Sequence, residues 1–147
     1  MAAADQRAGS RQYATFVVDD LFFGVDVLRV QEVLRYREMT AVPRSDGIIE
    51  GLINLRGQIV TALDMRRLLN LPRRADGETP MNVVLRSEGG AVSLLVDDIG
   101  DVIAVEPGDF EPPPATLDPA ARDMLEGVYK LEGRLLLVLA SNQLLEA

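Results

Sequence analysis

The regular alternation of short apolar runs with turn signals constrains the fold of this chain more than any other feature. Runs of about five to seven apolar or β-branched residues recur along the 147-residue sequence, and glycine, aspartate or asparagine separates them. This pattern predicts about eight or nine short strands, with neither a long amphipathic helix nor strands that alternate with long helices. We therefore predict a mostly β fold of small closed barrels with a few short helices.

The pattern is densest at residues 51–69, around which we expect the rest of the chain to be arranged. Residues 52–55 predict a buried strand, Arg56 and Gly57 predict a tight reversal, and residues 59–63 predict a second strand. The segment therefore predicts a β-hairpin with Arg56 at its tip. Further strands are predicted at residues 13–18, 21–25, 81–86, 91–96, 102–105, 125–131 and 135–139.

Three short helices are also predicted. Asp26, Asp64 and Ser141 are residue types that cap helix N-termini, and each precedes apolar residues. The apolar face of the first helix comprises Val27, Val30, Val33 and Leu34. The apolar face of the second comprises Met65, Leu68 and Leu69, which leaves Arg66 and Arg67 on the solvent side.

The segments between these elements predict connections and the domain organisation. Residues 1–10 are predicted to be disordered, and residues 40–47 to form a loop. Residues 70–77, with Arg73 and Arg74, read as a polar surface connector, and their position suggests two barrels, either in series or interlocked. Residues 107–119 hold five of the eight prolines and predict an extended segment across the surface.

Composition excludes much of enzymology. The chain has no cysteine, histidine or tryptophan, so disulfides, thiolate zinc sites and histidine-dependent triads are ruled out. The net charge of −8 argues against a nucleic-acid partner or an anionic membrane surface. No apolar run approaches the ~20 residues of a membrane span, and the N-terminus has no signal-peptide pattern, so we expect a cytoplasmic protein.

Acidic residues leave two alternative functions to weigh. Asp97, Asp98 and Asp101 crowd together, yet they lack the ligand spacing of a calcium loop, and turn carboxylates explain them better. Asp64 and these three residues could also supply a carboxylate enzyme, but no other catalytic residue type accompanies them. A nucleic-acid-binding barrel would need basic and aromatic residues that this chain lacks. No cofactor or metal is expected.

Charge is distributed unevenly along the chain. Residues 1–74 carry 11 basic and 9 acidic residues, or +2, whereas residues 75–147 carry 4 basic and 14 acidic residues, or −10. Two faces of opposite sign would suit a protein with two partners, and a simply solvated acidic half explains the same numbers.

Several motifs, in order, resemble the CheW family of scaffold proteins from bacterial chemotaxis arrays. The sequence GLINLRG at residues 51–57, followed by Ile59-Val60 and by LDMR at residues 63–66, resembles the family signature. Residues 16–33, 96–102 and 103–145 resemble the family's opening, middle and end. The resemblance covers nearly the whole chain from Tyr13 onward.

The resemblance implies a fold and a non-catalytic function. The expected fold is two intertwined SH3-like five-stranded barrels around a shared apolar core, so that residues 11–147 form a single CheW-like domain of two subdomains. The expected function is to couple the cytoplasmic tip of methyl-accepting chemotaxis receptors to the regulatory domain of the histidine kinase CheA. The resemblance also implies recruitment to membrane receptor arrays without membrane insertion, and assembly with the kinase into rings.

The resemblance also implies site residues. Val30 and Gly51 match receptor-coupling positions, and Glu32 and Arg56 match a charged pair beside the partner surfaces. Asn54, within the same motif, is expected to bind a partner as well. The chain departs from the family pattern in its strands, with Thr61-Ala62 in place of the common Pro-Val and with Ala140-Ser141 after the last strand. These departures keep open an adaptor of a non-flagellar pathway, such as twitching motility.

Overall fold

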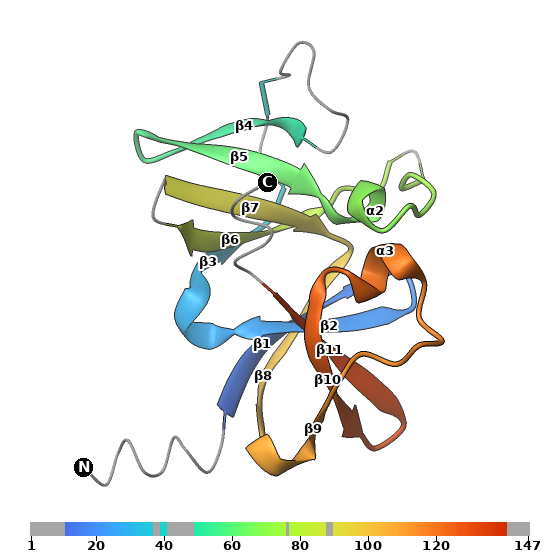
Figure 1. Ribbon diagram of the computed structural model, residues 1–147. Helices are drawn as coiled ribbons and strands as arrows, with labels where there is room; N and C mark the ends of the chain where they lie inside the picture. Colours follow the sequence, from blue (N-terminus) through green and yellow to red (C-terminus); the bar gives the residue numbers. More distant parts are fainter. Residues whose placement is uncertain (1–10, 37–38, 41–48, 76, 88–89, 141–147) are drawn as a thin grey trace, which may run out of the picture.

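The computed structural model describes residues 11–36, 39–40, 49–75, 77–87 and 90–140 (Figure 1). The predicted disorder of residues 1–10, most of the loop predicted at residues 40–47 and the helix predicted after Ser141 lie outside the described residues. Within the described ranges, no helix is long and apolar enough to cross a membrane.

The described residues are mostly strand and form two sheets. The strands are β1 (Arg11–Val18), β2 (Leu21–Asp26), β3 (Val30–Leu34), β4 (Ile49–Leu55), β5 (Gln58–Asp64), β6 (Met81–Ser87), β7 (Gly90–Val96), β8 (Asp98–Val105), β9 (Phe110–Glu111), β10 (Leu125–Leu131) and β11 (Arg134–Leu139). The six-stranded sheet has the order β8-β1-β2-β11-β10-β9, and the five-stranded sheet has the order β3-β6-β7-β5-β4. The short helices are η1 (Val27–Arg29), α2 (Met65–Leu68), η2 (Pro107–Asp109) and α3 (Pro119–Arg122).

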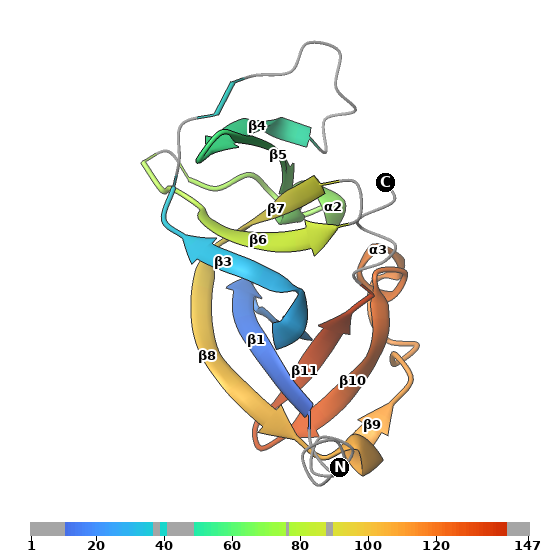
Figure 2. The same ribbon diagram turned by 90° about the vertical axis from the view of Figure 1, so that its left-hand side faces the viewer.

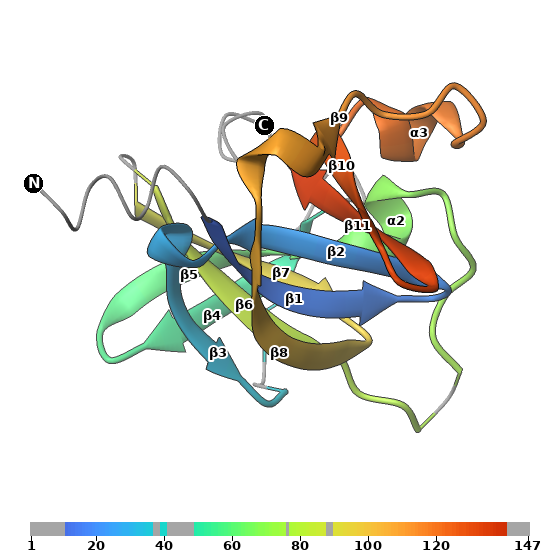
Figure 3. The same ribbon diagram turned by 90° about the horizontal axis from the view of Figure 1, so that it is seen from below.

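The two sheets are interlocked rather than in series, which settles the alternatives that the sequence leaves open. The chain begins in the six-stranded sheet, crosses to the five-stranded sheet at η1 and returns at Asp97, between β7 and β8. The N-terminal hairpin β1–β2 therefore lies between β8 and β11, as Figure 3 shows. Leu137 of β11 pairs in parallel with Phe23 of β2, so the last strand completes a sheet that the first strands begin.

A central apolar core joins the sheets. It includes Phe16 and Phe23 from the six-stranded sheet and Leu85 and Leu94 from the five-stranded sheet, all fully buried. Each sheet also has a smaller core of its own. The smaller core of the five-stranded sheet contains Ile53, Leu55, Val60 and Ala62 of the hairpin, and that of the six-stranded sheet contains Tyr13 of β1 and Tyr129 of β10. The expected fold of two small barrels that share a core is confirmed, and the two-residue strand β9 extends one of them to six strands.

Strands that contribute to two cores are apolar at successive positions. Val83 and Leu85 of β6 face the central core, while Val84 between them faces the smaller core of the five-stranded sheet. Successive side chains of a strand point to opposite faces, so continuous apolar runs indicate burial on both faces. The prediction that these strands are covered on both sides is confirmed.

The hairpin predicted at residues 52–63 is confirmed as β4 and β5, joined at Arg56 and Gly57. The helix after it is confirmed as α2, and the Asp64 side chain accepts a hydrogen bond from the Arg66 N–H at 3.1 Å. The expectation that Arg66 lies on the solvent side is wrong, because its side chain is only 14% exposed and is bound to Asp97.

The helix predicted after Asp26 is wrong beyond its first turn. Asp26 does cap η1, where its Oδ1 accepts a hydrogen bond from the Leu28 N–H at 2.9 Å. From Val30 onward the chain is strand β3, which pairs antiparallel with β6. The β-branched valines of this segment favour a strand, and β6 supplies the hydrogen-bonding edge that a lone segment lacks.

Three connecting segments also differ from their predictions. Asp98 and Asp101 lie within β8, so the turn predicted for them is wrong, and the strand predicted at residues 102–105 begins earlier. The proline-rich segment predicted to be extended instead begins with the short helix η2; strand β9 follows, and α3 begins at its last residue, Pro119. The 70–77 connector is not only a surface link, because the Arg74 side chain is 12% exposed and is held by Asp64 and Asp97.

Candidate partner-binding site

The turn between β4 and β5 places Arg56 at an exposed tip. Arg56 and Gly57 both have positive φ, 53° and 85°, as expected for the central residues of a two-residue hairpin turn that matches strand twist. The Asn54 side chain accepts a hydrogen bond from the Gly57 N–H at 3.0 Å and so closes the turn. Asn54 therefore shapes the tip, and the Arg56 side chain is 74% exposed.

Glu32 holds the Arg56 guanidinium in a two-pronged ion pair. Arg56 Nη1 donates to Glu32 Oε2 at 2.6 Å, and Arg56 Nη2 donates to Glu32 Oε1 at 2.9 Å. Hydrogen bonding to Glu32, together with its charge, raises the pKa of Arg56 above its ordinary value. The predicted pairing is confirmed, with Glu32 on strand β3 instead of a helix. A bidentate pair of this kind fixes direction, whereas an exposed one contributes little stability.

The ion pair also spans the open edges of the five-stranded sheet. Strand β3 is one edge of that sheet and β4 is the other, so Glu32 and Arg56 reach each other only because the sheet curls. A second contact, from Gln31 Nε2 to Gln58 Oε1 at 3.4 Å, joins β3 to the start of β5, next to the hairpin turn. The predicted binding residues thus also mark the line along which the sheet closes.

Val30 lies on the same strand as Glu32, at the point where the chain enters β3. It is half-buried against the central core and pairs with Leu85, and a bulge separates it from Glu32. Its carbonyl accepts a hydrogen bond from Arg86 Nη1 at 2.9 Å, and the same nitrogen donates to the Leu28 carbonyl at 3.1 Å. Val30 therefore sits at the anchored crossing between the sheets.

Gly51 lies apart from the exposed tip and is buried. A Cβ placed on Gly51 would lie 2.8 Å from the Thr40 carbonyl oxygen and 2.9 Å from the Met39 Cβ. Thr40 and Leu52 exchange two backbone hydrogen bonds of 2.9 Å beside it. The structure therefore brings Glu32, Asn54 and Arg56 together and gives Gly51 an intramolecular role, the close passage of the Met39–Thr40 backbone.

Sequence reasoning missed the apolar part of this surface. Leu28 of η1 is 72% exposed, and Val33 of β3 and Val102 of β8 are also exposed. These elements lie on the face turned to the viewer in Figure 2. The helical interpretation placed Val33 in the core, whereas Val33 is 41% exposed on β3.

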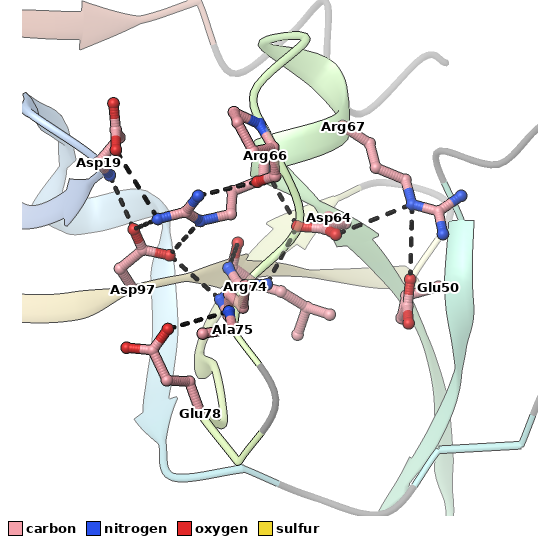
Figure 4. Close-up of polar contacts among 11 residues, drawn as sticks. Asp19, Glu50, Asp64, Arg66, Arg67, Arg74, Ala75, Glu78 and Asp97 are labelled. Atoms are coloured by element: carbon pink, nitrogen blue, oxygen red, sulfur yellow. Dashed lines mark hydrogen bonds and ion pairs between the residues drawn. The ribbon is translucent and has the colours of Figure 1, made fainter.

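Two of the four carboxylates weighed for an enzyme, those of Asp64 and Asp97, are engaged in structural contacts (Figure 4). Asp97 pairs with Arg66 and Arg74, and Asp64 pairs with Arg74. Burial raises the pKa of Asp97, but hydrogen bonds from Arg66 and from the Asp19 N–H, with the two arginine charges, outweigh it and hold the pKa below its ordinary value of 3.8. An aspartate that stays ionised is a poor proton donor. Among the described residues, no group of three or more acidic side chains is arranged to hold a metal ion.

The fold and the site define a small two-sheet β protein whose candidate site is an exposed surface rather than a catalytic cleft. The family model for the CheW-like domain matches residues 12–147. The chain therefore belongs to the CheW-like family, whose members are scaffold and adaptor proteins and generally non-catalytic.

Individual relatives agree with this assignment. Chemotaxis protein CheW of Rhizobium meliloti (strain 1021) is 28% identical over 135 residues, which cover 92% of this chain and 87% of the relative. Protein FrzA of Myxococcus xanthus is 30% identical over 132 residues, which cover 90% of this chain and 82% of FrzA. The crystal structure of the scaffolding protein TtCheW from Thermoanaerobacter tengcongensis is similar with a TM-score of 0.77 and 27% identity, over 88% of each chain.

Proposed function

We propose that this protein is a non-catalytic adaptor that couples methyl-accepting chemotaxis receptors to a CheA-type histidine kinase. Relatives named chemotaxis protein CheW support the chemosensory setting. In this proposal the protein works in the cytoplasm at membrane receptor arrays, without inserting into the membrane. Residues 11–147 act as one domain of two barrel subdomains, and assembly with the kinase closes into rings.

The observation that carries the proposal is the Arg56 guanidinium, exposed yet held in one direction by Glu32. Arginine is enriched among the residues that dominate protein–protein binding, and a preorganised side chain loses less conformational entropy when it binds. The Glu32–Arg56 pair therefore offers a partner an ordered charged contact. Asn54 supports it by closing the turn from which Arg56 projects.

The receptor tip is assigned to the face that carries Leu28, Val30, Val33 and Val102. Leu28, Val33 and Val102 are exposed large hydrophobics on elements that share one face (Figure 2), and exposed apolar surface of this kind marks interaction sites. Val30 lies between Leu28 and Val33 along the chain, at the crossing between the sheets. Gly51 contributes indirectly, through the backbone passage that it permits.

A second candidate function is supported by the relative named FrzA. FrzA is not named CheW and yet is 30% identical to this chain. An adaptor of a different chemosensory pathway, with its own receptors and kinase, would use the same surfaces. Binding to the kinases of one genome, tested in parallel, separates the two candidates.

The test is titration calorimetry of the full chain against the regulatory domain of a CheA kinase from the same genome, and then against a receptor-tip fragment. Saturable one-to-one binding to both partners is expected. Arg56→Ala should weaken binding about tenfold, because removing an arginine hot spot costs more than about 1 kcal/mol. Its melting temperature should stay near that of the wild type, since an exposed ion pair contributes about 0–1 kcal/mol.

Arg35→Ala is the matched control, because Arg35 is an exposed arginine just beyond β3. Binding of this variant should equal that of the wild type. A large fall in the melting temperature of Arg56→Ala would make the ion pair a structural clasp of the sheet instead. Wild-type binding to neither partner would contradict the adaptor proposal.

A further inference from the structure

Asp97 is the residue at which the chain passes from one sheet to the other. It follows β7 of the five-stranded sheet and precedes β8 of the six-stranded sheet, with no loop between the two strands. Its own N–H donates to the Val17 carbonyl of β1 at 3.0 Å. The backbone of Asp97 is therefore already held by the sheet that the chain is entering.

The Asp97 carboxylate accepts hydrogen bonds from both sheets (Figure 4). On the side of the six-stranded sheet, the Asp19 N–H in the β1–β2 turn donates to Oδ2 at 2.7 Å. On the side of the five-stranded sheet, Arg66 at the start of α2 donates from Nε to Oδ1 at 2.9 Å and from Nη2 to Oδ2 at 2.7 Å. One side chain thus bridges elements that pack in different sheets.

Two arginines extend this bridge into the 70–77 connector. Arg66 Nη1 donates to the Pro72 carbonyl at 2.8 Å, and Arg74 Nη2 donates to the Leu95 carbonyl of β7 at 3.1 Å. Arg74 also pairs with Asp97 at 3.1 Å and with Asp64 at 3.3 Å. Both arginine side chains are largely buried, so solvent screens these contacts less than it screens the Glu32–Arg56 pair.

We propose that Asp97, Arg66 and Arg74 form a joint that fixes the angle between the two sheets. The central core holds the sheets together and its close packing limits their relative motion, but apolar burial itself is non-directional. Bidentate arginine–carboxylate contacts do fix direction. The chain crosses between the sheets at two described places, η1 and Asp97, and the proposed joint lies at the second.

The joint explains why the polar segment 70–77 contains Arg74, which a simple surface connector would not need. Arg74 reaches back from this segment to Asp97, so the connector is part of the fastening between the sheets. The functional consequence of the joint rests on the proposed adaptor role: a fixed angle would keep the Arg56 tip and the exposed face of η1, β3 and β8 in one geometry. The joint itself is testable without any partner.

The experiment measures the distance between two spin labels on the full chain by pulsed electron paramagnetic resonance. The chain has no cysteine, so Ile59→Cys in β5 and Glu132→Cys in the β10–β11 turn place one label on each sheet, at exposed positions. A narrow distance distribution is expected for the parent chain. Asp97→Ala should broaden or shift it, and Arg66→Lys, which keeps the charge but loses the two-pronged contact, should do so to a smaller extent.

Asp98→Ala is the matched control, because the exposed Asp98 carboxylate bonds to the adjacent Ile99 N–H and, within the described ranges, connects no other elements. Its distance distribution should equal that of the parent. Should Asp97→Ala fail to fold, Asp97→Asn and Arg66→Lys carry the test, since both nearly keep the side-chain volume. An unchanged distribution in every folded joint variant, even with a lower melting temperature, would overturn the joint and leave a purely stabilising cluster.

Partner binding separates failure of the joint from failure of the proposed function. If the adaptor proposal holds, folded joint variants should bind the kinase domain or the receptor tip singly but lose affinity for the second partner once the first is bound. If the wild type binds neither partner, the adaptor proposal fails while the distance measurement still decides the joint.

Discussion

Gly51 illustrates how a residue without a side chain shapes the site. The resemblance to the CheW family assigns it to receptor coupling, and the structure places it beneath the backbone of Met39 and Thr40. Both statements are compatible if the passage of this backbone positions the surface that a partner contacts. For Arg56, in contrast, the sequence already predicts the kind of contact that the structure shows, because an arginine at a hairpin tip can reach a carboxylate such as that of Glu32.

Gly51→Ala should lower the free energy of unfolding by about 1–3 kcal/mol, because the added methyl group forces a backbone carbonyl to move. At a chain length near 150 residues, this corresponds to a fall in melting temperature of about 3–10 °C. Gly108→Ala is the control, since a Cβ there meets nothing within 4 Å. A Gly51→Ala variant with an unchanged melting temperature but weaker receptor binding would place Gly51 at the partner surface itself.

At the scale of elements, β3 shows where sequence reasoning succeeds and fails. The β4–β5 hairpin, the Asp64 cap and most strands were predictable, because turn residues and apolar alternation are local signals. Val27, Val30, Val33 and Leu34 fit a helical face equally well, and only pairing with β6, distant in sequence, makes the last three of them strand. The contacts of Arg66 and Arg74 with Asp97 were not predictable for the same reason.

A buried polar pair ties the end of β3 to the sheet, and we predict that it is sensitive to truncation. Asn82 and Ser93 are fully buried; Ser93 Oγ donates to Asn82 Oδ1 at 2.8 Å, and Asn82 Nδ2 donates to the Arg35 carbonyl at 3.1 Å. Ser93→Ala leaves the Asn82 oxygen without this donor and should cost about 1–3 kcal/mol of unfolding free energy in denaturant titrations.

Thr79→Ala is a suitable comparison for Ser93→Ala, because Thr79 is an exposed residue outside the strands. Faster hydrogen exchange at the β3 amides in Ser93→Ala would show that the pair anchors this strand. Equal stability of the two variants would mean that the sheet accommodates the lost hydrogen bond by local rearrangement.

For the whole molecule, the depressed pKa of Asp97 predicts an acid-sensitive attachment between the sheets. The unfolded chain binds the Asp97 proton more readily than the folded chain does, because the arginines and the Asp19 N–H stabilise the carboxylate. This contribution to stability is complete above the ordinary pKa of 3.8 and is lost as the pH falls through that value toward the folded pKa.

Thermal unfolding across pH 3 to 7, roughly the range over which carboxylates titrate, checks this expectation. The melting temperature of Asp97→Asn should fall less steeply below about pH 5 than that of the exposed control Asp98→Asn. Parallel pH profiles of the two variants would show that Asp97 gains no net stabilisation from its partners.

The parallel pairing of β11 with β2 has a consequence for how the protein is made. All strands of the five-stranded sheet are contiguous in sequence, so this sheet can assemble as soon as the ribosome has released residues 30–96. The hairpin β1–β2 leaves the ribosome before the five-stranded sheet does, but its neighbour β11 leaves only after that sheet. The first hairpin must therefore wait with an unpaired edge, and closure of so long a loop makes this step slow and exposed to aggregation.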